Sequence, residues 1–528
     1  MRPHLLPIAL LLAISGRADS YVRQTAIDVI QYEIALELSE ATESISGTTR
    51  IHVRVLQDNV SSMWLDLEDM VVDRLLVSGQ PRPFMHRDGR LAFEFDRPYR
   101  PHEIVAAEVH YHGRPGQTGM LIGKNKHGRR VFFTENWPDR AHYWFPCIDH
   151  PSDKATVDFA VTAPEKFDVV ANGRLVETRS LMDGRKLTRW SERVPIPTYC
   201  MVIGAAEFSV THAGASAGVP LSSYVYPPDA AAAAKVFSRS GLALQYFSDL
   251  IGPYPYEKLA QVESTVRIGG MENSSVIFYA ESIFQRASPG EGPVPHEIAH
   301  QWFGDSVTES DWDHLWLSEG FATYFNALFH EQLEGPEAVK RTMTRAAEAV
   351  KKYHQSRPAP IIDPEVKDPA KKLNAFTYQK GAWVLHMLRK ILGDGVFFKG
   401  IQRYYQLHAG GNVLTEDFQR VMESVSGVSL DAFFRQWLYQ PGWPDYRVSW
   451  RFDGNANELE LTIRQAQTTG LFDMPVDIAF RFGERREIQS FRISEESHTF
   501  RIAVQSQPTS IEIDPDGWIL KSVAVAAR

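Results

Sequence analysis

The sequence predicts a multidomain α+β protein with an N-terminal antiparallel β domain, a mainly helical middle part and a small C-terminal β-sandwich. Short segments of alternating apolar and polar residues run from about Tyr21 to Glu207, and a period of two is typical of half-buried strands. Helix signals begin near Pro227 and dominate to about Gly442. Beyond Pro444 the alternation returns, as expected for a sandwich of short strands. We therefore expect the three parts to span residues 19–207, 208–444 and 445–528.

The clearest strand patterns lie near the start and near the end of the chain. Apolar residues occupy every second position in several runs: Tyr32, Ile34, Leu36 and Leu38; Ile51, Val53 and Val55; Leu459, Leu461 and Ile463; Ile478 and Phe480; Ile511 and Ile513. In a strand, alternate residues point to the same face of the sheet. These side chains are therefore expected to face the cores of their sheets.

The middle part shows several helix signals. Asp229 is a suitable N-cap for an alanine-rich helix through Leu250, which Gly252 would end. Further helices are expected over residues 317–330, from Tyr378 onward, and from Thr415, as the cap, to Gly427. Their apolar stripes are interpreted as core.

Composition narrows the class of protein. The chain has 528 residues, 44% of them hydrophobic, and 65 acidic against 56 basic residues give a net charge of −9. This balance argues against a phosphate-binding surface, so nucleic acid is not an expected partner. The two cysteines, Cys147 and Cys200, are consistent with one disulfide or with two buried free thiols, because sequence does not supply the geometry.

The N-terminus has the layout of a signal peptide over residues 1–18. Arg2 and His4 precede the apolar run 5–14, and small residues at Gly16 and Ala18 suit a cleavage site. The run is short for a membrane span, although an uncleaved anchor is the alternative. We expect export to the periplasm or the extracellular medium, with no stable membrane span after cleavage.

The most informative motif is His296-Glu297-Ile298-Ala299-His300. Residues four apart share one face of a helix, so the two imidazoles can hold one metal ion, and the helix is expected to start near Pro295. Zinc prefers histidine nitrogens and carboxylate oxygens, and a catalytic site leaves one position open for water. Glu319 would be the third ligand, and Glu297 would be the base that takes a proton from that water. Two surface histidines on an amphipathic helix are the alternative for the motif alone.

Two further motifs flank this helix. The segment Gly269-Gly270-Met271-Glu272-Asn273 lies upstream in a strand-like run, where paired glycines mark either a bulge or a close backbone approach. The segment Tyr378-Gln379-Lys380-Gly381 lies downstream at a helix start.

Together these motifs resemble the gluzincin aminopeptidases of the M1 family. The flanking segments agree: 301–304 (QWFG), 316–320 (WLSEG), 145–147 (FPC) and 253–255 (PYP). The resemblance covers essentially the whole mature chain. It implies a thermolysin-like catalytic domain over residues 208–444 and one Zn²⁺ per chain.

The resemblance also implies roles for single residues. His296, His300 and Glu319 match the zinc ligands, and Glu297 matches the general base. Tyr378 matches the tyrosine that stabilises the oxyanion of the tetrahedral intermediate. Within the 269–273 segment, Glu272 matches the partner of the substrate's free α-amino group, and Gly269 and Gly270 match the backbone that aligns the substrate. Met271 and Asn273 belong to the same segment and are expected to bind substrate with them.

The sequence departs from the family pattern in two places. Family members usually carry Gln or Glu ten residues before the Cys of the FPC segment, and Trp137 stands there. Glu135 lies two residues earlier and would face the same side of a strand, although surface exposure is the more ordinary expectation for it. Trp137 would wall the pocket for the first side chain or fill core. The sequence also stops after the predicted sandwich, where larger relatives continue into a helical domain, so a short form is expected.

The function that these features favour is an exported zinc aminopeptidase acting on peptides with a free N-terminus. The open alternatives are an endopeptidase or mixed-specificity peptidase, favoured by Trp137, and less strongly an epoxide hydrolase or a binding protein that retains a dead fold. The preferred N-terminal residue, the physiological substrate and the oligomeric state stay open.

Overall fold

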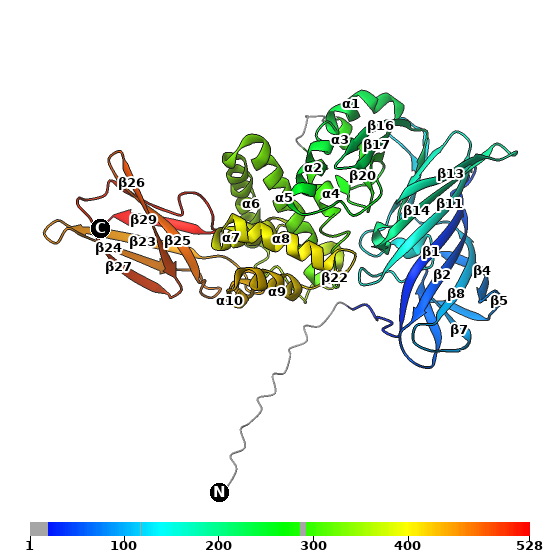
Figure 1. Cartoon of the computed structure of the whole chain (residues 1–528), viewed down its shortest axis with the longest axis horizontal. Helices are drawn as coiled ribbons and strands as arrows, with labels where there is room; N and C mark the ends of the chain where they lie inside the picture. The colour runs from blue at the N-terminus through cyan, green and yellow to red at the C-terminus, as the bar shows by residue number, and fades with distance from the viewer. Residues whose placement is uncertain (1–19, 117, 286–291, 528) are drawn as a thin grey trace, which may run out of the picture.

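The computed structural model describes residues 20–116, 118–285 and 292–527, and the expected signal peptide lies outside them. The molecule is elongated, with the N-terminal sheets at one end, helices in the middle and the C-terminal sheets at the other end (Figure 1). This order agrees with the predicted β-rich, helical and β-rich succession.

A large mixed sheet forms the outer part of the N-terminal region. Its strands, in spatial order, are β13 (Arg174–Ser180), β14 (Arg185–Pro197), β11 (Lys154–Pro164), β1 (Ile27–Glu37), β2 (Ile45–Val55), β8 (Ile104–Gly113), β4 (Met70–Val77) and β5 (Gln80–Pro81). The predicted alternation is confirmed, since Ile51, Val53 and Val55 are fully buried. One pair differs from the antiparallel expectation, because β1 and β11 run parallel.

Two smaller sheets complete the N-terminal region. One contains β12 (Asp168–Ala171), β15 (Ile203–Ala206), β10 (Arg130–Glu135) and β9 (Gly119–Lys124), and the other contains β3 (Val60–Asp66), β7 (Arg90–Tyr99) and β6 (Phe84–Arg87). Strand β10 ends at Glu135, two residues before Trp137, so Trp137 lies in the following loop.

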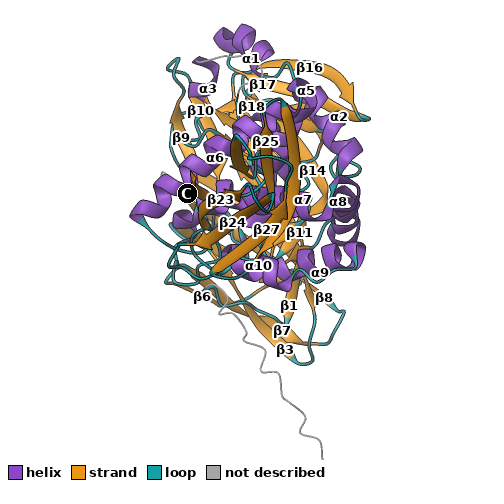
Figure 2. Cartoon of the chain, turned by 90° about the vertical axis from the view of Figure 1, so that its left-hand side faces the viewer, coloured by secondary structure: helices purple, strands orange, loops and turns teal. Residues whose placement is uncertain are grey.

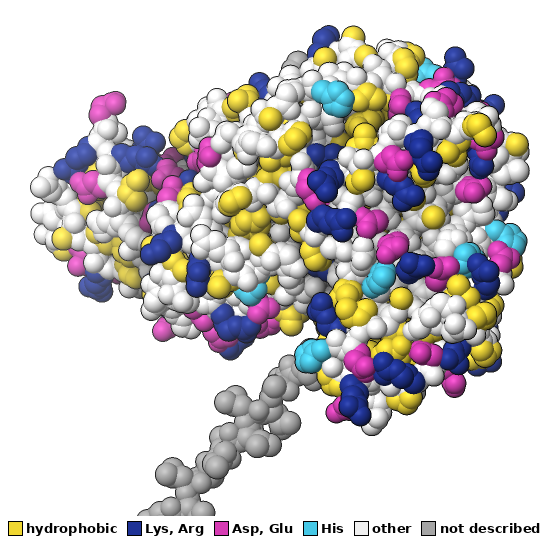
Figure 3. All heavy atoms as spheres, turned by 45° about the vertical axis from the view of Figure 1, so that its right-hand side comes forward, with side chains coloured by type: hydrophobic (Ala, Val, Ile, Leu, Met, Phe, Trp, Pro, Cys, Tyr) yellow, Lys and Arg dark blue, Asp and Glu magenta, His cyan; other side chains and the backbone are white. Residues whose placement is uncertain are grey.

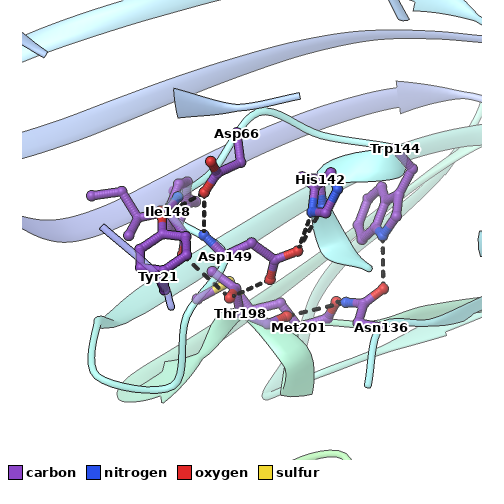
Figure 4. Close-up of polar contacts among 10 residues, drawn as sticks. Tyr21, Asp66, Asn136, His142, Trp144, Ile148, Asp149, Thr198 and Met201 are labelled. Atoms are coloured by element: carbon purple, nitrogen blue, oxygen red, sulfur yellow. Dashed lines mark hydrogen bonds and ion pairs between the residues drawn. The ribbon is translucent and has the colours of Figure 1, made fainter. Parts of the chain in front are cut away.

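A buried polar network holds this loop in place (Figure 4). The Asp149 carboxylate accepts hydrogen bonds from His142 Nδ1 at 2.7 Å and from Thr198 Oγ1 at 3.0 Å. Its backbone N–H donates to Asp66 Oδ2 at 3.0 Å, and the hydroxyl of Tyr21 donates to the same oxygen at 2.5 Å. The network thus joins the N-terminal segment to the loop that follows β10.

The two cysteines are both buried and free, so the free-thiol alternative is the one that the structure supports. Cys200 Sγ lies 3.4 Å from Asp305 Oδ1, whereas Cys147 pairs through its backbone with Asp66. Burial, together with nearby carboxylates, raises the pKa of both thiols well above its usual value.

The middle region combines a mixed five-stranded sheet with helices. The sheet contains β16 (Ser209–Ser216), β17 (Val219–Val225), β18 (Leu259–Ser264), β20 (Val276–Ala280) and the edge strand β19 (Gly270–Met271). A parallel two-stranded pair, β21 (Thr308–Glu309) with β22 (Asn412–Val413), lies further along. The helices are α1 (Ala230–Val236), α2 (Ser240–Leu250), α3 (Glu281–Gln285), α4 (Val294–His300), α5 (Trp316–Glu334), α6 (Pro336–Ser356), α7 (Gly381–Leu392), α8 (Asp394–His408), α9 (Thr415–Ser426) and α10 (Asp431–Leu438).

The single helix expected from Asp229 to Leu250 is wrong, because the chain breaks it into α1 and α2. The hydroxyl of Ser238 donates to the Lys235 carbonyl at 2.7 Å, and such a local bond competes with the helix ladder. Asp229 makes no capping bond, since its carboxylate contacts His127 Nε2 at 2.5 Å instead.

The other helix predictions agree more closely. The expected helix at 317–330 lies within α5, and Gly427 ends α9 with a left-handed φ of +74°. Thr415 is the first residue of α9 and not its cap. Its hydroxyl instead accepts a hydrogen bond from Trp316 Nε1 at 2.9 Å, a contact between two helices that local sequence does not indicate.

The C-terminal region forms two sheets that face the viewer in Figure 2. One contains β27 (Ser497–Ala503), β24 (Glu458–Gln465), β23 (Asp445–Asp453) and β29 (Ser522–Ala527), and the other contains β26 (Arg485–Ile493), β25 (Met474–Phe482) and β28 (Ser510–Ile513). The apolar residues predicted to face inward are buried, among them Leu459, Leu461 and Ile478.

His386 of helix α7 makes one of the contacts between this region and the helices. The ring of His386 stacks on Trp518 with centroids 4.4 Å apart, and Tyr324 Oη lies 3.1 Å from His386 Nδ1. Burial, with the charge of Arg389 beside it, lowers the pKa of His386 to about 3. The neutral ring is therefore the form that fits this contact.

Acid should weaken the molecule through this histidine. A histidine in the unfolded chain has a pKa of about 6.5. Between about pH 6.5 and pH 3, residue 386 therefore binds a proton in the unfolded state and stays neutral in the folded state. The folded state consequently loses stability relative to the unfolded state as the pH falls through this range. We expect the free energy of unfolding of the native protein to fall by on the order of 2 kcal/mol more than that of His386→Phe between pH 7 and pH 5. Urea denaturation followed by tryptophan fluorescence measures this difference. If the free energy of unfolding fell equally with pH in the native protein and in His386→Phe, the prediction would be contradicted. His212→Phe, at an exposed histidine, is the matched control and should follow the native protein.

The surface has no strong charge bias on the face shown in Figure 3, where basic and acidic side chains are interspersed. Within the described ranges, no helix is both long enough and apolar enough to cross a lipid bilayer.

Candidate active site

The two histidines of the HEIAH motif and Glu319 converge, as predicted. Helix α4 carries His296 and His300 one turn apart, and helix α5 carries Glu319 in its first turn. The Nε2 atoms of the histidines are 3.1 Å apart, and each lies 3.3 Å from Glu319 Oε2. Three ligand atoms of the types that zinc prefers thus point at one small volume.

The surroundings of this cluster fit a metal ion. Glu319 Oε2 is buried and, among the described residues, accepts no hydrogen bond of good geometry. His300 Nδ1 lies 3.1 Å from the Phe303 carbonyl and 3.0 Å from Ser318 Oγ. A hydrogen bond at Nδ1 leaves the Nε2 lone pair free for a ligand, which is the usual arrangement of metal-binding histidines.

Tyr378 reaches the cluster from a third element. It lies in a turn of π-helix, Phe376–Lys380, that leads into α7, and its hydroxyl donates to Glu319 Oε1 at 2.5 Å. The close approach of this turn to α5 depends on glycine: a Cβ on Gly320 would lie 2.9 Å from the Cα of Gly381. Two glycines therefore let the elements that carry Glu319 and Tyr378 pack directly together.

Glycine also shapes the contact between the 269–273 segment and helix α4. A Cβ on Gly270 would lie 2.3 Å from Glu297 Oε1, whereas a Cβ on Gly269 would meet nothing within 4 Å. Strand β19 thus passes against the Glu297 carboxylate, and only a residue without a side chain fits there. Gly270 is consequently at a close approach, one of the two alternatives left open by the sequence, whereas Gly269 is not.

Glu272 stands near the same histidine as Glu297. One oxygen of Glu272, one oxygen of Glu297 and a nitrogen of His300 lie within 4.8 Å of one another. Gln301 fixes this segment, because its amide donates to the Glu272 carbonyl at 2.6 Å and accepts from the Ser275 N–H at 2.8 Å.

Burial and the charges within the site both shift the pKa values of its ionisable groups. It raises the pKa of Glu272 to about 7 and, opposed by the charge of His300, the pKa of Glu297 well above its usual value. Burial alone would also raise the pKa of Glu319, but the charge of His300 and the close contacts with both histidines outweigh it and lower that pKa to about 2. Although burial opposes the change, the charges of Glu272 and Glu319 raise the pKa of His300 well above its usual value. The same burial lowers the pKa of His296.

The predicted residues share one cavity of about 230 Å³. It is lined by Trp137, Ile268, Gly269, Gly270, Met271, Glu272, Pro293, His296, Glu297, His300, Glu319, Leu373 and Tyr378. Asn273 is not among the lining residues; it is buried, and its amide donates to the Met271 carbonyl at 3.4 Å. The site-lining set therefore contains every predicted site residue except Asn273.

Trp137 and Glu135, the two residues considered where the sequence departs from the family pattern, differ in their position relative to the cavity. Trp137 lines the cavity and is also buried in the core of the N-terminal region, so the pocket-wall and the core-filling alternatives both agree with the structure. The expectation of an exposed Glu135 is wrong: only 6% of the residue is exposed, because it ends the paired strand β10 opposite Gly119. Glu135 lies 3.6 Å from Arg140 and does not line the cavity.

Sequence reasoning missed the residues that orient the others. Gln301 stands next to the predicted ligand His300, and Ser318 stands next to the predicted ligand Glu319; in the sequence both are only parts of flanking segments. Lys154 lies on β11, far from these residues in the sequence, and its ammonium donates to the carbonyls of Asp305 and Ser306 at 3.0 and 2.8 Å. The position next to a ligand was the one available signal for the first two, and no local pattern indicates the third.

Comparison with known families agrees with this geometry. Residues 29–200 match the Peptidase M1 N-terminal domain, and residues 239–437 match the Peptidase family M1 domain. The second match includes α4, α5 and the Tyr378 turn.

Individual relatives are more distant. The chain is 26% identical to an aminopeptidase A of Gloydius brevicauda, over 80% of this chain and 47% of that protein. It is 24% identical to the glutamyl aminopeptidase of Homo sapiens, over 82% of this chain and 49% of the relative. It is 26% identical to the tricorn protease-interacting factor F2 of Thermoplasma acidophilum, over 86% and 59% respectively. The chain thus spans about half the length of the curated relatives it matches. With both M1 domains matched in order and the site assembled within them, the chain belongs to peptidase family M1, a family of zinc-dependent metallopeptidases.

Proposed function

We propose that this protein is an exported zinc aminopeptidase that releases the first residue of peptides with a free N-terminus. The observation that carries the proposal is the assembly, in one cavity, of a three-residue zinc ligand set, a buried carboxylate at Glu297 and a second carboxylate at Glu272. A carboxylate that stands beside a ligand set is suited to anchor an ammonium group close to the reacting bond, because a buried ammonium is costly without a partner.

Each side chain has a distinct task in this proposal. His296, His300 and Glu319 would hold one Zn²⁺, which when bound supplies a Lewis acid and makes water a stronger acid. Glu297 takes the proton of the attacking water and delivers it to the leaving amine. In the structure the hydroxyl of Tyr378 donates a hydrogen bond to Glu319 at 2.5 Å. During the reaction it donates instead to the carbonyl oxygen of the substrate, on which negative charge develops. Glu272 pairs with the α-ammonium group and so fixes the register of cleavage.

Other parts of the proposal rest on the sequence. The leader-like residues 1–18 support export to the periplasm or the extracellular medium. The structure supports the expected divisions of the chain: β15 and β16 belong to different sheets on the two sides of residue 207, and helix α10 is followed by strand β23 near residue 444.

Matched substrates test the proposed exopeptidase activity. We expect the purified protein to hydrolyse aminoacyl-arylamides with a free amine and to cleave their N-acetyl versions at less than a tenth of that rate, because the blocked amide leaves Glu272 without a charged partner. Metal analysis of the same sample should find about one zinc per chain. EDTA should remove the activity, and added zinc should restore it.

The blocked substrates also separate the main alternative. Equal cleavage of free and N-acetylated substrates would reject the amine anchor and favour an endopeptidase or mixed-specificity peptidase. Glu272→Gln is the matched variant, because it should raise the KM for free substrates while leaving the poor cleavage of blocked ones unchanged.

A further inference from the structure

The lining of the cavity combines two kinds of side chain. The carboxylates of Glu272, Glu297 and Glu319 line it together with the two histidines. Four further lining residues are apolar: Trp137, Ile268, Met271 and Leu373. Among the described residues, no lysine or arginine lines the cavity.

In the proposed aminopeptidase, the ionisable lining residues bind the reacting part of the substrate. The α-ammonium group lies at Glu272 and the carbonyl lies at the ligand set beside Tyr378. The first side chain branches from the Cα atom between these two points. The apolar lining residues are the ones that remain to contact it.

Aromatic packing holds Trp137, one of these apolar lining residues, in place. The ring of Trp137 meets Trp312 edge to face with centroids 5.6 Å apart, and Trp312 packs against Tyr199 at 5.7 Å. Trp312 and Tyr199 are both at least 98% buried. The indole is thus fixed in place as a wall before any substrate binds.

Nearby cations are directed elsewhere. Lys372, next to Leu373, donates to Asp313 Oδ1 at 2.5 Å and to the Asp363 carbonyl at 3.0 Å. Arg267, next to Ile268, is exposed and does not line the cavity. Among the described residues, a carboxylate on the first side chain would consequently lie beside apolar lining residues with no lysine or arginine of the lining to pair with.

The size of the cavity sets a further limit. Pockets that enclose drug-sized ligands usually measure about 300–1,000 Å³, and this one measures about 230 Å³. It therefore suits about one residue of moderate size.

We infer that the enzyme is selective for neutral, apolar first residues of the size of leucine or methionine, that it rejects acidic first residues, and that Trp137 is the residue that sets this selectivity. The inference rests on the proposed aminopeptidase function and adds its substrate class.

A panel of leucyl-, methionyl-, alanyl- and glutamyl-arylamides tests the inference on the full-length protein. We expect kcat/KM for the leucyl and methionyl substrates to exceed that for the glutamyl substrate by on the order of 100-fold or more, because a buried unpaired charge is heavily penalised. A glutamyl substrate cleaved as fast as the leucyl one would overturn the inference. No release from any free-amine substrate would instead overturn the proposed function, so the two failures are distinguishable.

Variants at Trp137 test the assigned residue. In Trp137→Ala the leucyl-to-alanyl ratio of kcat/KM should fall about tenfold, because the wall that contacts the longer side chain is removed. Trp137→Phe keeps an aromatic wall and should retain most of the ratio. Trp64→Ala, at a tryptophan of strand β3 that does not line the cavity, is the matched control and should change neither rate nor ratio. An unchanged ratio in folded Trp137→Ala would show that Trp137 does not set the selectivity.

Discussion

Replacing Glu297 by Gln should lower turnover about a thousandfold or more while zinc stays bound. General-base catalysis typically contributes on the order of 100- to 10,000-fold, and Gln has the shape of Glu without the ability to accept the proton. Glu297 supplies no atom to the ligand set of His296, His300 and Glu319, so the affinity for metal should change little. Steady-state kinetics and metal analysis of one preparation measure both quantities.

Two comparisons make this result specific to Glu297. Glu297→Asp keeps the charge but withdraws it by one methylene, so it should retain more activity than Glu297→Gln. Glu337→Gln, at an exposed glutamate of helix α6, should behave like the native protein. Near-native turnover in Glu297→Gln would exclude this residue as the base, and loss of zinc in that variant would mean that it acts as a ligand.

The predictable part of the site is the part that follows from one helix. His296 and His300 are one turn apart in α4, and helical periodicity alone places their rings together. Glu319 and Tyr378 are carried by other elements, and only the family resemblance linked them to the histidines. The alternating strands were predictable for the same reason as the helix, because burial on one face imposes a period of two.

The parts that could not be predicted depend on contacts distant in sequence. The residue type of Asp229 predicts a helix cap, but its carboxylate forms a hydrogen bond with His127, which is distant in the sequence. Glu135 was expected at the surface, but pairing of β10 with β9 buries it. In the sequence, Gln301 is one residue of the flanking segment 301–304, and only the fold shows that it joins the end of helix α4 to the segment that carries Glu272. In each case a tertiary contact overrides a local preference.

The contact between Gly270 and Glu297 leads to a second large expected effect. Gly270→Ala should lower kcat/KM about a hundredfold, because the new Cβ would lie 2.3 Å from Glu297 Oε1 and must displace either the base or the strand. A displacement of about 1 Å in a catalytic group can reduce the rate by this factor. Zinc content should not change, since the clash does not involve a ligand. Kinetics and metal analysis again measure both.

The neighbouring glycine provides the matched control. A Cβ on Gly269 meets nothing within 4 Å, so Gly269→Ala should lose far less activity than Gly270→Ala. The double variant Gly270→Ala, Glu297→Gln decides how Gly270 acts. If Gly270 serves to position the Glu297 carboxylate, the double variant should be no slower than Glu297→Gln, because residues that act as one unit are not additive. A further hundredfold loss in the double variant would mean that Gly270 contributes to substrate binding independently of the base.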